Sequence, residues 1–144
     1  MRVAIVTVGD ELLVGDTVNT NAAWLGRQLA ERGVDVERST TVPDRVDDIA
    51  GVVDEYRDRY DAVLVTGGLG PTHDDMTMDA VGTAFGVPVE ENEAALAWLA
   101  ENGYARGDLA AGTADIPAGA EPLHHEAGGP PGRGHRDGFG LPGV

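Results

Sequence analysis

Residues 61–75 read DAVLVTGGLGPTHDD and join an apolar segment to a glycine-rich turn and two aspartates. Asp61–Thr66 is apolar throughout its middle, which predicts a buried strand. The segment TMDAVGTAFG, residues 77–86, then predicts a helix with Thr77 as its N-cap and Gly86 as its stop. A glycine-rich turn between a strand and a helix is a place where backbone N–H groups can face a phosphate.

The segments before this stretch alternate in the same way. Arg2–Val8 is an apolar, mostly β-branched run that predicts a buried parallel strand, and Val34–Val42 predicts a second, less buried one. Helices are expected over residues 18–33 and, from the 3,4,3,4 spacing of apolar residues, over 46–60. This order predicts an α/β fold with a mostly parallel sheet that helices cover on both faces.

The rest of the chain divides into a segment with a helical pattern and a segment rich in Gly and Pro. EENEAALAWLAENG, Glu90–Gly103, predicts a further helix with acidic residues in its first turn. From Gly112 onward the chain is rich in Gly and Pro and poor in large apolar side chains, which predicts loop, turns and partial disorder. We therefore expect a domain over residues 1–128 and a Gly/Pro-rich tail over 129–144.

The charge balance limits the partners. Asp and Glu total 25 against 10 basic residues, all of them Arg, and the net charge is -15. Such a chain repels nucleic acid and anionic membranes, and no 18-residue apolar run or signal peptide is visible, so we expect a cytoplasmic protein. The absence of Lys favours adaptation to a salt-rich (halophilic) cytoplasm, although codon bias alone also depletes Lys. There is no Cys, hence no disulfide or thiolate chemistry.

Carboxylates follow each of the three expected strands. Asp10 and Glu11 leave the first strand, Asp44 leaves the second, and Asp74 and Asp75 close the glycine-rich stretch. In parallel sheets these strand ends share one edge, where ligands bind. A divalent cation such as Mg²⁺ would reconcile these acids with a phosphate, because it binds carboxylates and bridges to phosphate oxygens. The alternative is that the acids only cap a helix and face solvent in a chain this acidic.

Other site types are less well supported. The chain lacks the Lys of a P-loop, and Gly67, Gly68 and Gly70 do not fit the dinucleotide fingerprint. The histidines are read as surface residues, and Trp24 and Trp98 as core residues or subunit contacts.

Three segments together resemble a known family. They are VGDELLVGDTVNTNAAWLGRQLAERG (8–33), TVPD (41–44) and TGGLGPTHDDMT (66–77). The chain resembles the molybdopterin-binding (MoaB/Mog-like) domain family, and within it the N-terminal domain of CinA-type proteins, over about residues 1–128. The resemblance implies a three-layer α/β sandwich and a dimer or trimer.

The resemblance also implies several functions and the residues for them. One is metal-dependent pyrophosphatase activity on ADP-ribose or a similar dinucleotide. The sequence Gly-Leu-Gly at residues 68–70 favours this activity, because dedicated adenylyltransferases usually have Gly-Thr-Gly there. The others are molybdopterin binding or adenylylation in molybdenum cofactor biosynthesis, and binding without turnover. Asp44 and Asp75 are the implied catalytic residues, and Asp74 and Asp75 the expected ligands of the divalent metal. The expected contacts to the phosphate-bearing ligand are Gly9, Asp10, Glu11, Asn19, Thr66, Gly67, Gly68, Gly70, Pro71 and Thr72.

Two departures from the family pattern stand near the end of the chain. Family members continue past a PGVP-EM segment, whereas this chain ends at LPGV (141–144), so we expect no second domain. The family also has an apolar strand just before that segment. Here the corresponding residues are RGHRDGFG (133–140), which predict a poor strand.

Overall fold

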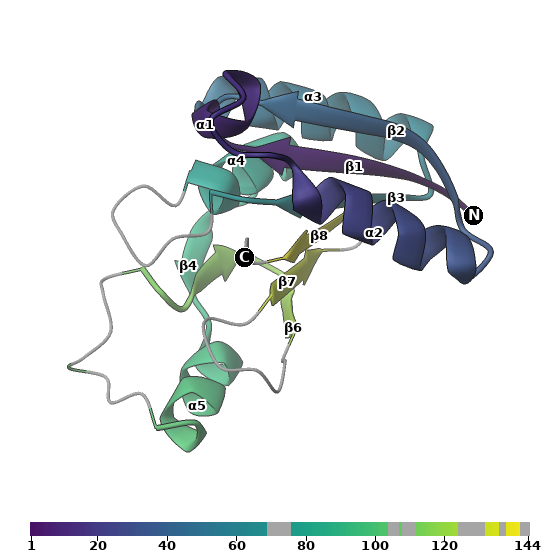
Figure 1. Cartoon of the computed structure of the whole chain (residues 1–144). Coiled ribbons are helices and arrows are strands. Elements are labelled where there is room, and N and C mark those ends of the chain that lie inside the picture. The colour runs from purple at the N-terminus through teal and green to yellow at the C-terminus, as the bar shows by residue number, and fades with distance from the viewer. Residues whose placement is uncertain (69–75, 104–106, 108–111, 124–131, 136–137, 142–144) are drawn as a thin grey trace.

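The computed structural model describes residues 1–68, 76–103, 107, 112–123, 132–135 and 138–141. Its centre is a six-stranded sheet in the order β2-β1-β3-β8-β7-β6 (Figure 1). Neighbouring strands from β2 to β8 are parallel, and β7 and β6 complete the sheet in antiparallel pairs. The strands are β1 (Arg2–Val8), β2 (Asp35–Val42), β3 (Ala62–Thr66), β6 (Glu121–Leu123), β7 (Gly132–His135) and β8 (Gly138–Leu141).

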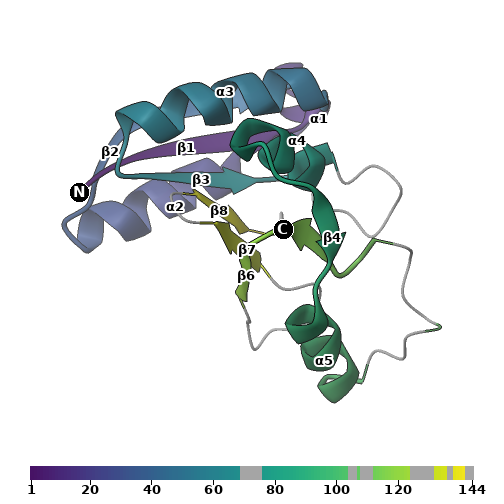
Figure 2. The ribbon, with the colours of Figure 1, turned by 180° about the vertical axis from the view of Figure 1, so that it is seen from behind.

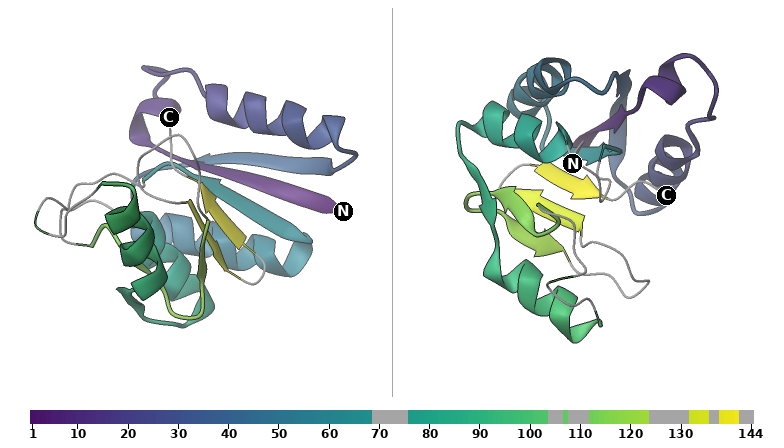
Figure 3. Two further views of the ribbon diagram at one scale, coloured as in Figure 1. Left: turned by 90° about the horizontal axis from the view of Figure 1, so that it is seen from below. Right: turned by 90° about the vertical axis from the view of Figure 1, so that its left-hand side faces the viewer.

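Helices cover both faces of the parallel part of the sheet, which confirms the predicted α/β sandwich of three layers. Helix α2 (Thr20–Glu31) lies on one face, and α3 (Val46–Arg59) and α4 (Met76–Phe85) lie on the other (Figures 2 and 3). Side chains alternate along β1 because a strand has a period of two. Val6 and Val8 therefore pack into the core with α3 and α4, while Thr7 points toward the side of α2.

A smaller unit extends from α4. Strands β4 (Val89–Glu91) and β5 (Asp115–Pro117) form an antiparallel pair, and α5 (Glu93–Glu101) follows β4. The helix predicted over Glu90–Gly103 is therefore shorter than expected. Its first residues pair with β5, and the Asn92 side chain accepts a hydrogen bond from the Ala95 N–H and begins α5.

The expectation of a poor strand over residues 133–140 is wrong. Gly132–His135 and Gly138–Leu141 form β7 and β8, and β8 pairs in parallel with β3, with Leu64 opposite Phe139. Strand pairing is carried by backbone N–H and C=O groups, so a strand edge already in place can order a sequence of low β-propensity. The predicted domain boundary at residue 128 falls outside the described residues and stays a prediction.

Candidate functional site

The carboxyl ends of β1, β2 and β3 meet at one edge of the sheet, as their parallel order requires. In Figure 1 this edge is on the left, where the short helix α1 (Asp10–Leu13) follows β1 and the chain leaves β3. Asp10 comes two residues after β1 and Asp44 two residues after β2. The sequence-based expectation that acidic residues from separate strands converge here is confirmed for this pair.

Asp10 and Asp44 bind each other's backbone. The Asp10 N–H donates to Asp44 Oδ2 at 3.0 Å, and the Asp44 N–H donates to Asp10 Oδ1 at 3.2 Å. Each carboxylate thus has one oxygen in this exchange and a second oxygen for another partner. The described part of the chain holds no group of three or more His, Asp or Glu side chains arranged around a metal. Mg²⁺ in proteins often has only one or two carboxylate ligands, with phosphate and water as the others.

The turn after β3 admits only glycine. Gly67 has φ +93°, and a Cβ there would lie 2.2 Å from the backbone oxygen of Val8. Gly68 has φ +64°, and a Cβ there would lie 2.4 Å from Thr77 Oγ1. The turn is therefore packed tightly against β1 and α4, and this close approach requires glycine at both positions.

Thr77 has a different role from the predicted one. It is not the N-cap of α4, because the helix already begins at Met76. Its fully buried hydroxyl donates to the Gly67 carbonyl oxygen at 2.8 Å. The side chain thus ties the start of α4 to the glycine turn.

A row of threonines crosses the sheet at this edge. Thr41 on β2, Thr7 on β1 and Thr66 on β3 are register partners, so their side chains share one face, the side of α2. The Thr7 and Thr41 hydroxyls lie 2.8 Å apart, and Asn19 Nδ2 donates to Thr7 Oγ1 at 2.8 Å. Asn19 Oδ1 also accepts from the Ala22 N–H and caps α2. This network positions the start of α2 over the sheet.

Thr66 differs from the other two threonines. Like Thr7 it is buried, with 3% of the residue exposed, whereas Thr41 is half-buried. No hydrogen-bond partner for its hydroxyl occurs in the described part of the chain, whereas buried polar groups are nearly always paired. Such a group marks a place where a ligand or a water completes the pairing.

Thr66 lies in the wall of a pocket of about 110 Å³. The pocket is bounded below by the ends of β1 and β3 and on its sides by α1, the α1–α2 connection and the first residues of α2. Among the described residues its lining consists of Thr7, Val8, Glu11, Leu12, Thr17, Val18, Asn19, Thr20, Asn21, Thr66 and Gly67. Glu11 is the charged member of this set.

Only some of the predicted ligand residues line this pocket. Glu11, Asn19, Thr66 and Gly67 line the pocket. Gly9 and Gly68 are neighbours of lining residues in the chain. A Cβ at Gly9 would lie 2.6 Å from a Glu11 carboxylate oxygen, and one at Gly68 would lie 2.4 Å from Thr77 Oγ1. The predicted residues Gly70, Pro71, Thr72, Asp74 and Asp75 lie outside the described residues.

Sequence reasoning missed Thr7, Thr41 and Asn21. Thr7 and Thr41 sit inside apolar strands, where a threonine is ordinary, and only the register shows that they lie beside Thr66. Asn21 belongs to the NTN segment, whose first residue alone was singled out.

The sheet order, the three layers and this edge define a class: α/β domains of the type found in molybdenum cofactor biosynthesis proteins. A model of the family described as "Probable molybdopterin binding domain" matches residues 4–144. The chain belongs to the molybdopterin-binding domain family.

Relatives with curated names and solved structures agree with this assignment. A CinA-like protein of Frankia casuarinae is 43% identical over 157 aligned residues, which include all of this chain but 36% of the relative. The crystal structure of CinA from Thermoplasma acidophilum superposes with a TM-score of 0.89 at 35% identity, covering 99% of this chain and 88% of that chain. The molybdopterin biosynthesis enzyme MoaB of Thermus thermophilus superposes with a TM-score of 0.63 at 25% identity, covering 99% and 81%.

The described helices can be compared with the length and composition of a membrane-spanning helix. None of them combines the length and the apolar character that a bilayer crossing requires.

Proposed function

We propose that this domain binds a phosphate-bearing pterin or dinucleotide at the shared edge of β1, β2 and β3. The observation that carries the proposal is the glycine turn, which packs against β1 and α4 and lies at the same sheet edge as a polar pocket and an aspartate pair. Family membership and the CinA-like relatives support the ligand class.

In this proposal each part of the edge has its own task. The turn presents backbone to the phosphates, and the Thr77 hydroxyl holds that turn in place. Asp10 and Asp44 would hold Mg²⁺, together with Asp74 and Asp75 from the predicted set. A bound Mg²⁺ would neutralise phosphate charge and polarise the phosphorus centre.

For the reaction we propose cleavage of a nucleoside diphosphate linkage such as that of ADP-ribose. Asp44 and Asp75 would orient the phosphates and the attacking water. The second candidate is molybdopterin binding or adenylylation, which the fold shared with MoaB favours. A binding module without turnover is the third.

Incubation with ADP-ribose and Mg²⁺, assayed for AMP, tests the reaction. We expect AMP to form with the wild-type chain and to fall at least about tenfold in Asp44→Asn and in Asp75→Asn, a loss of ~1.4 kcal/mol in transition-state stabilisation. Asp58→Asn, on the exposed side of α3, is the matched control and should leave the rate unchanged. Molybdopterin binding without AMP formation would favour the second candidate, and binding of ADP-ribose without AMP the third.

We also propose that the domain is a cytoplasmic homo-oligomer. Four large apolar residues are exposed on α1, the α1–α2 connection and α2: Leu13 (50%), Val14 (72%), Val18 (77%) and Trp24 (56%). Exposed apolar groups in one region are typical of protein contacts. Sedimentation should show a dimer or trimer that Trp24→Gln weakens, and a wild-type monomer at all concentrations would contradict this.

A further inference from the structure

The pocket beside β3 differs in charge from the rest of the ligand edge. Its charged lining residue among those described is Glu11, no Arg contributes to that lining, and the chain contains no Lys. A carboxylate without a cation repels phosphate at short range. The pocket therefore does not suit the phosphates of the ligand.

The groups that face the pocket instead suit a neutral partner. No donor to the Glu11 carboxylate occurs among the described residues, and a carboxylate can only accept hydrogen bonds. The buried Thr66 hydroxyl is also without a partner there and can donate as well as accept. The amide of Asn21 adds a further neutral donor and acceptor at the start of α2.

The size of the pocket indicates a fragment rather than a whole ligand. Its volume of about 110 Å³ is well below the roughly 300–1,000 Å³ of sites that enclose a complete small molecule. A single ring fits this description better than a dinucleotide does.

We propose that this pocket is the subsite for a neutral ring of the ligand that presents two adjacent hydrogen-bond donors to Glu11 and a polar atom to Thr66. The phosphates stay outside the pocket, at the glycine turn and the aspartate pair. Vicinal hydroxyls of a ribose and the N–H edge of a pterin ring share this chemistry, and a carboxylate is a common partner of ribose hydroxyls. The proposal rests on the proposed function for the phosphate end and assigns the other end.

Calorimetry with separate probes tests the two ends. Inorganic pyrophosphate with Mg²⁺ reports on the phosphate end; D-ribose and 6-hydroxymethylpterin, both without phosphate, report on the pocket. We expect Glu11→Gln to weaken binding of at least one neutral probe by about tenfold or more, because a hydrogen bond to a charged acceptor is lost. Pyrophosphate binding should stay the same or become tighter. Whichever neutral probe responds identifies the sugar or the pterin as the source.

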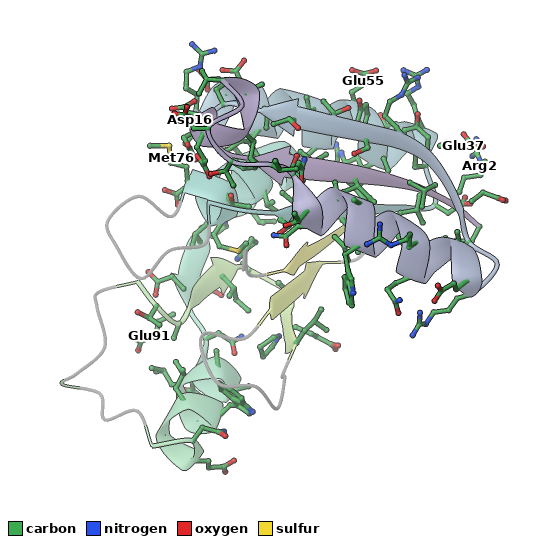
Figure 4. All side chains as sticks on the ribbon, viewed as in Figure 1. Arg2, Asp16, Glu37, Glu55, Met76 and Glu91 are labelled. Atoms are coloured by element: carbon green, nitrogen blue, oxygen red, sulfur yellow. The ribbon has the colours of Figure 1, made fainter. Side chains whose placement is uncertain are left out.

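Two controls separate a local effect from a general one. Glu37→Gln makes the same change on β2 near Arg2, at the end of the sheet opposite to Asp16 and Met76, and should alter no affinity (Figure 4). Thr66→Val should weaken the responding neutral probe, and Thr66→Ser, which keeps the hydroxyl, should restore most of the binding.

The outcomes distinguish the two proposals. If pyrophosphate fails to bind while a neutral probe binds in a Glu11-dependent way, the proposed phosphate site is wrong and the pocket assignment stands. If neither neutral probe binds the wild-type chain, or if Glu11→Gln leaves both affinities unchanged, the pocket assignment is overturned.

Discussion

The ends of β1 and β2 lie beside the end of β3, yet the two regions differ in hydrogen bonding. The polar side chains of the first region have partners, and the threonine hydroxyl of the second has none among the described residues. At the first region Thr7, Thr41 and Asn19 bond to one another, and Asp10 and Asp44 exchange two backbone hydrogen bonds. At the second, the Thr66 hydroxyl has no partner among the described residues. Gly67 and Gly68 there adopt a backbone conformation that other residues rarely accept.

This difference separates a scaffold from a binding surface. A polar network in which every member is paired holds its parts rigidly, and here it orients α2 and α1 over the sheet. Buried polar groups without a partner lower stability and are found mainly at functional sites. The contrast therefore assigns the positioning of α2 to Thr7, Thr41 and Asn19, and ligand contact to Thr66. The second carboxylate oxygens of Asp10 and Asp44 stay available for the proposed Mg²⁺.

The largest effect is expected from Gly67→Ala. A Cβ at this position would lie 2.2 Å from the Val8 carbonyl oxygen, and that oxygen belongs to backbone that cannot rotate away. We expect the free energy of unfolding to fall by about 2–5 kcal/mol, combining about 1–2 kcal/mol for the left-handed backbone with about 1–3 kcal/mol for the clash. Urea unfolding followed by circular dichroism measures it.

Gly33→Ala is the control for that variant. Gly33 has a similar positive φ of +75° after α2, but nothing lies within 4 Å of the position of its Cβ. The free energy of unfolding should therefore fall only by the cost of the left-handed backbone, about 1–2 kcal/mol. Equal losses in the two variants would show that the turn is not pressed against β1.

Thr7→Val and Thr66→Val compare two register partners directly. Thr7→Val removes the acceptor of Asn19 and the partner of Thr41, so the free energy of unfolding should fall by about 1–3 kcal/mol. Thr66→Val removes a hydroxyl without a partner in the described chain, so stability should stay the same or rise by up to about 1 kcal/mol. The same urea titration measures both variants. A larger loss of unfolding free energy in Thr66→Val than in Thr7→Val would contradict the assignment of the paired hydroxyl to Thr7 and the unpaired one to Thr66.

The smallest effect concerns the aspartate pair. Asparagine at position 44 can still accept the Asp10 N–H, and one of two facing negative charges disappears. At low salt we expect Asp44→Asn to raise the free energy of unfolding by less than ~1 kcal/mol, the order of one charge pair in water at 4 Å. The gain should vanish in molar KCl, because salt screens the repulsion.

Thermal melts of wild type and Asp44→Asn from 0.1 to 2 M KCl measure this screening, because the Debye length falls over that range from about 10 Å to below about 3 Å. Wild type should gain stability with KCl because the chain carries a net charge of -15. The gain should be smaller in Asp44→Asn, while Asp58→Asn should follow the wild type more closely. A wild-type melting temperature that stays flat would contradict both the pairwise and the general repulsion.

The sequence by itself determined the elements that depend on local pattern. The buried strands 2–8 and 61–66, the helix over 46–60 and the glycine turn all follow from periodicity and from residues with special backbone preferences. The order of these elements also placed Asp10 and Asp44 at one edge, because parallel strands end on the same side.

Only the tertiary structure decided the rest. Residues 133–140 lack the pattern of a strand, and the edge of β3 supplies the pairing that makes Gly138–Leu141 one. Thr7, Thr41 and Thr66 lie on different strands, and no spacing in the chain reveals that register joins them in one row. Whether a buried hydroxyl has a partner depends on which atoms the fold brings within about 3 Å of it. That is a property of three-dimensional packing, and it is what distinguishes Thr66 from Thr7.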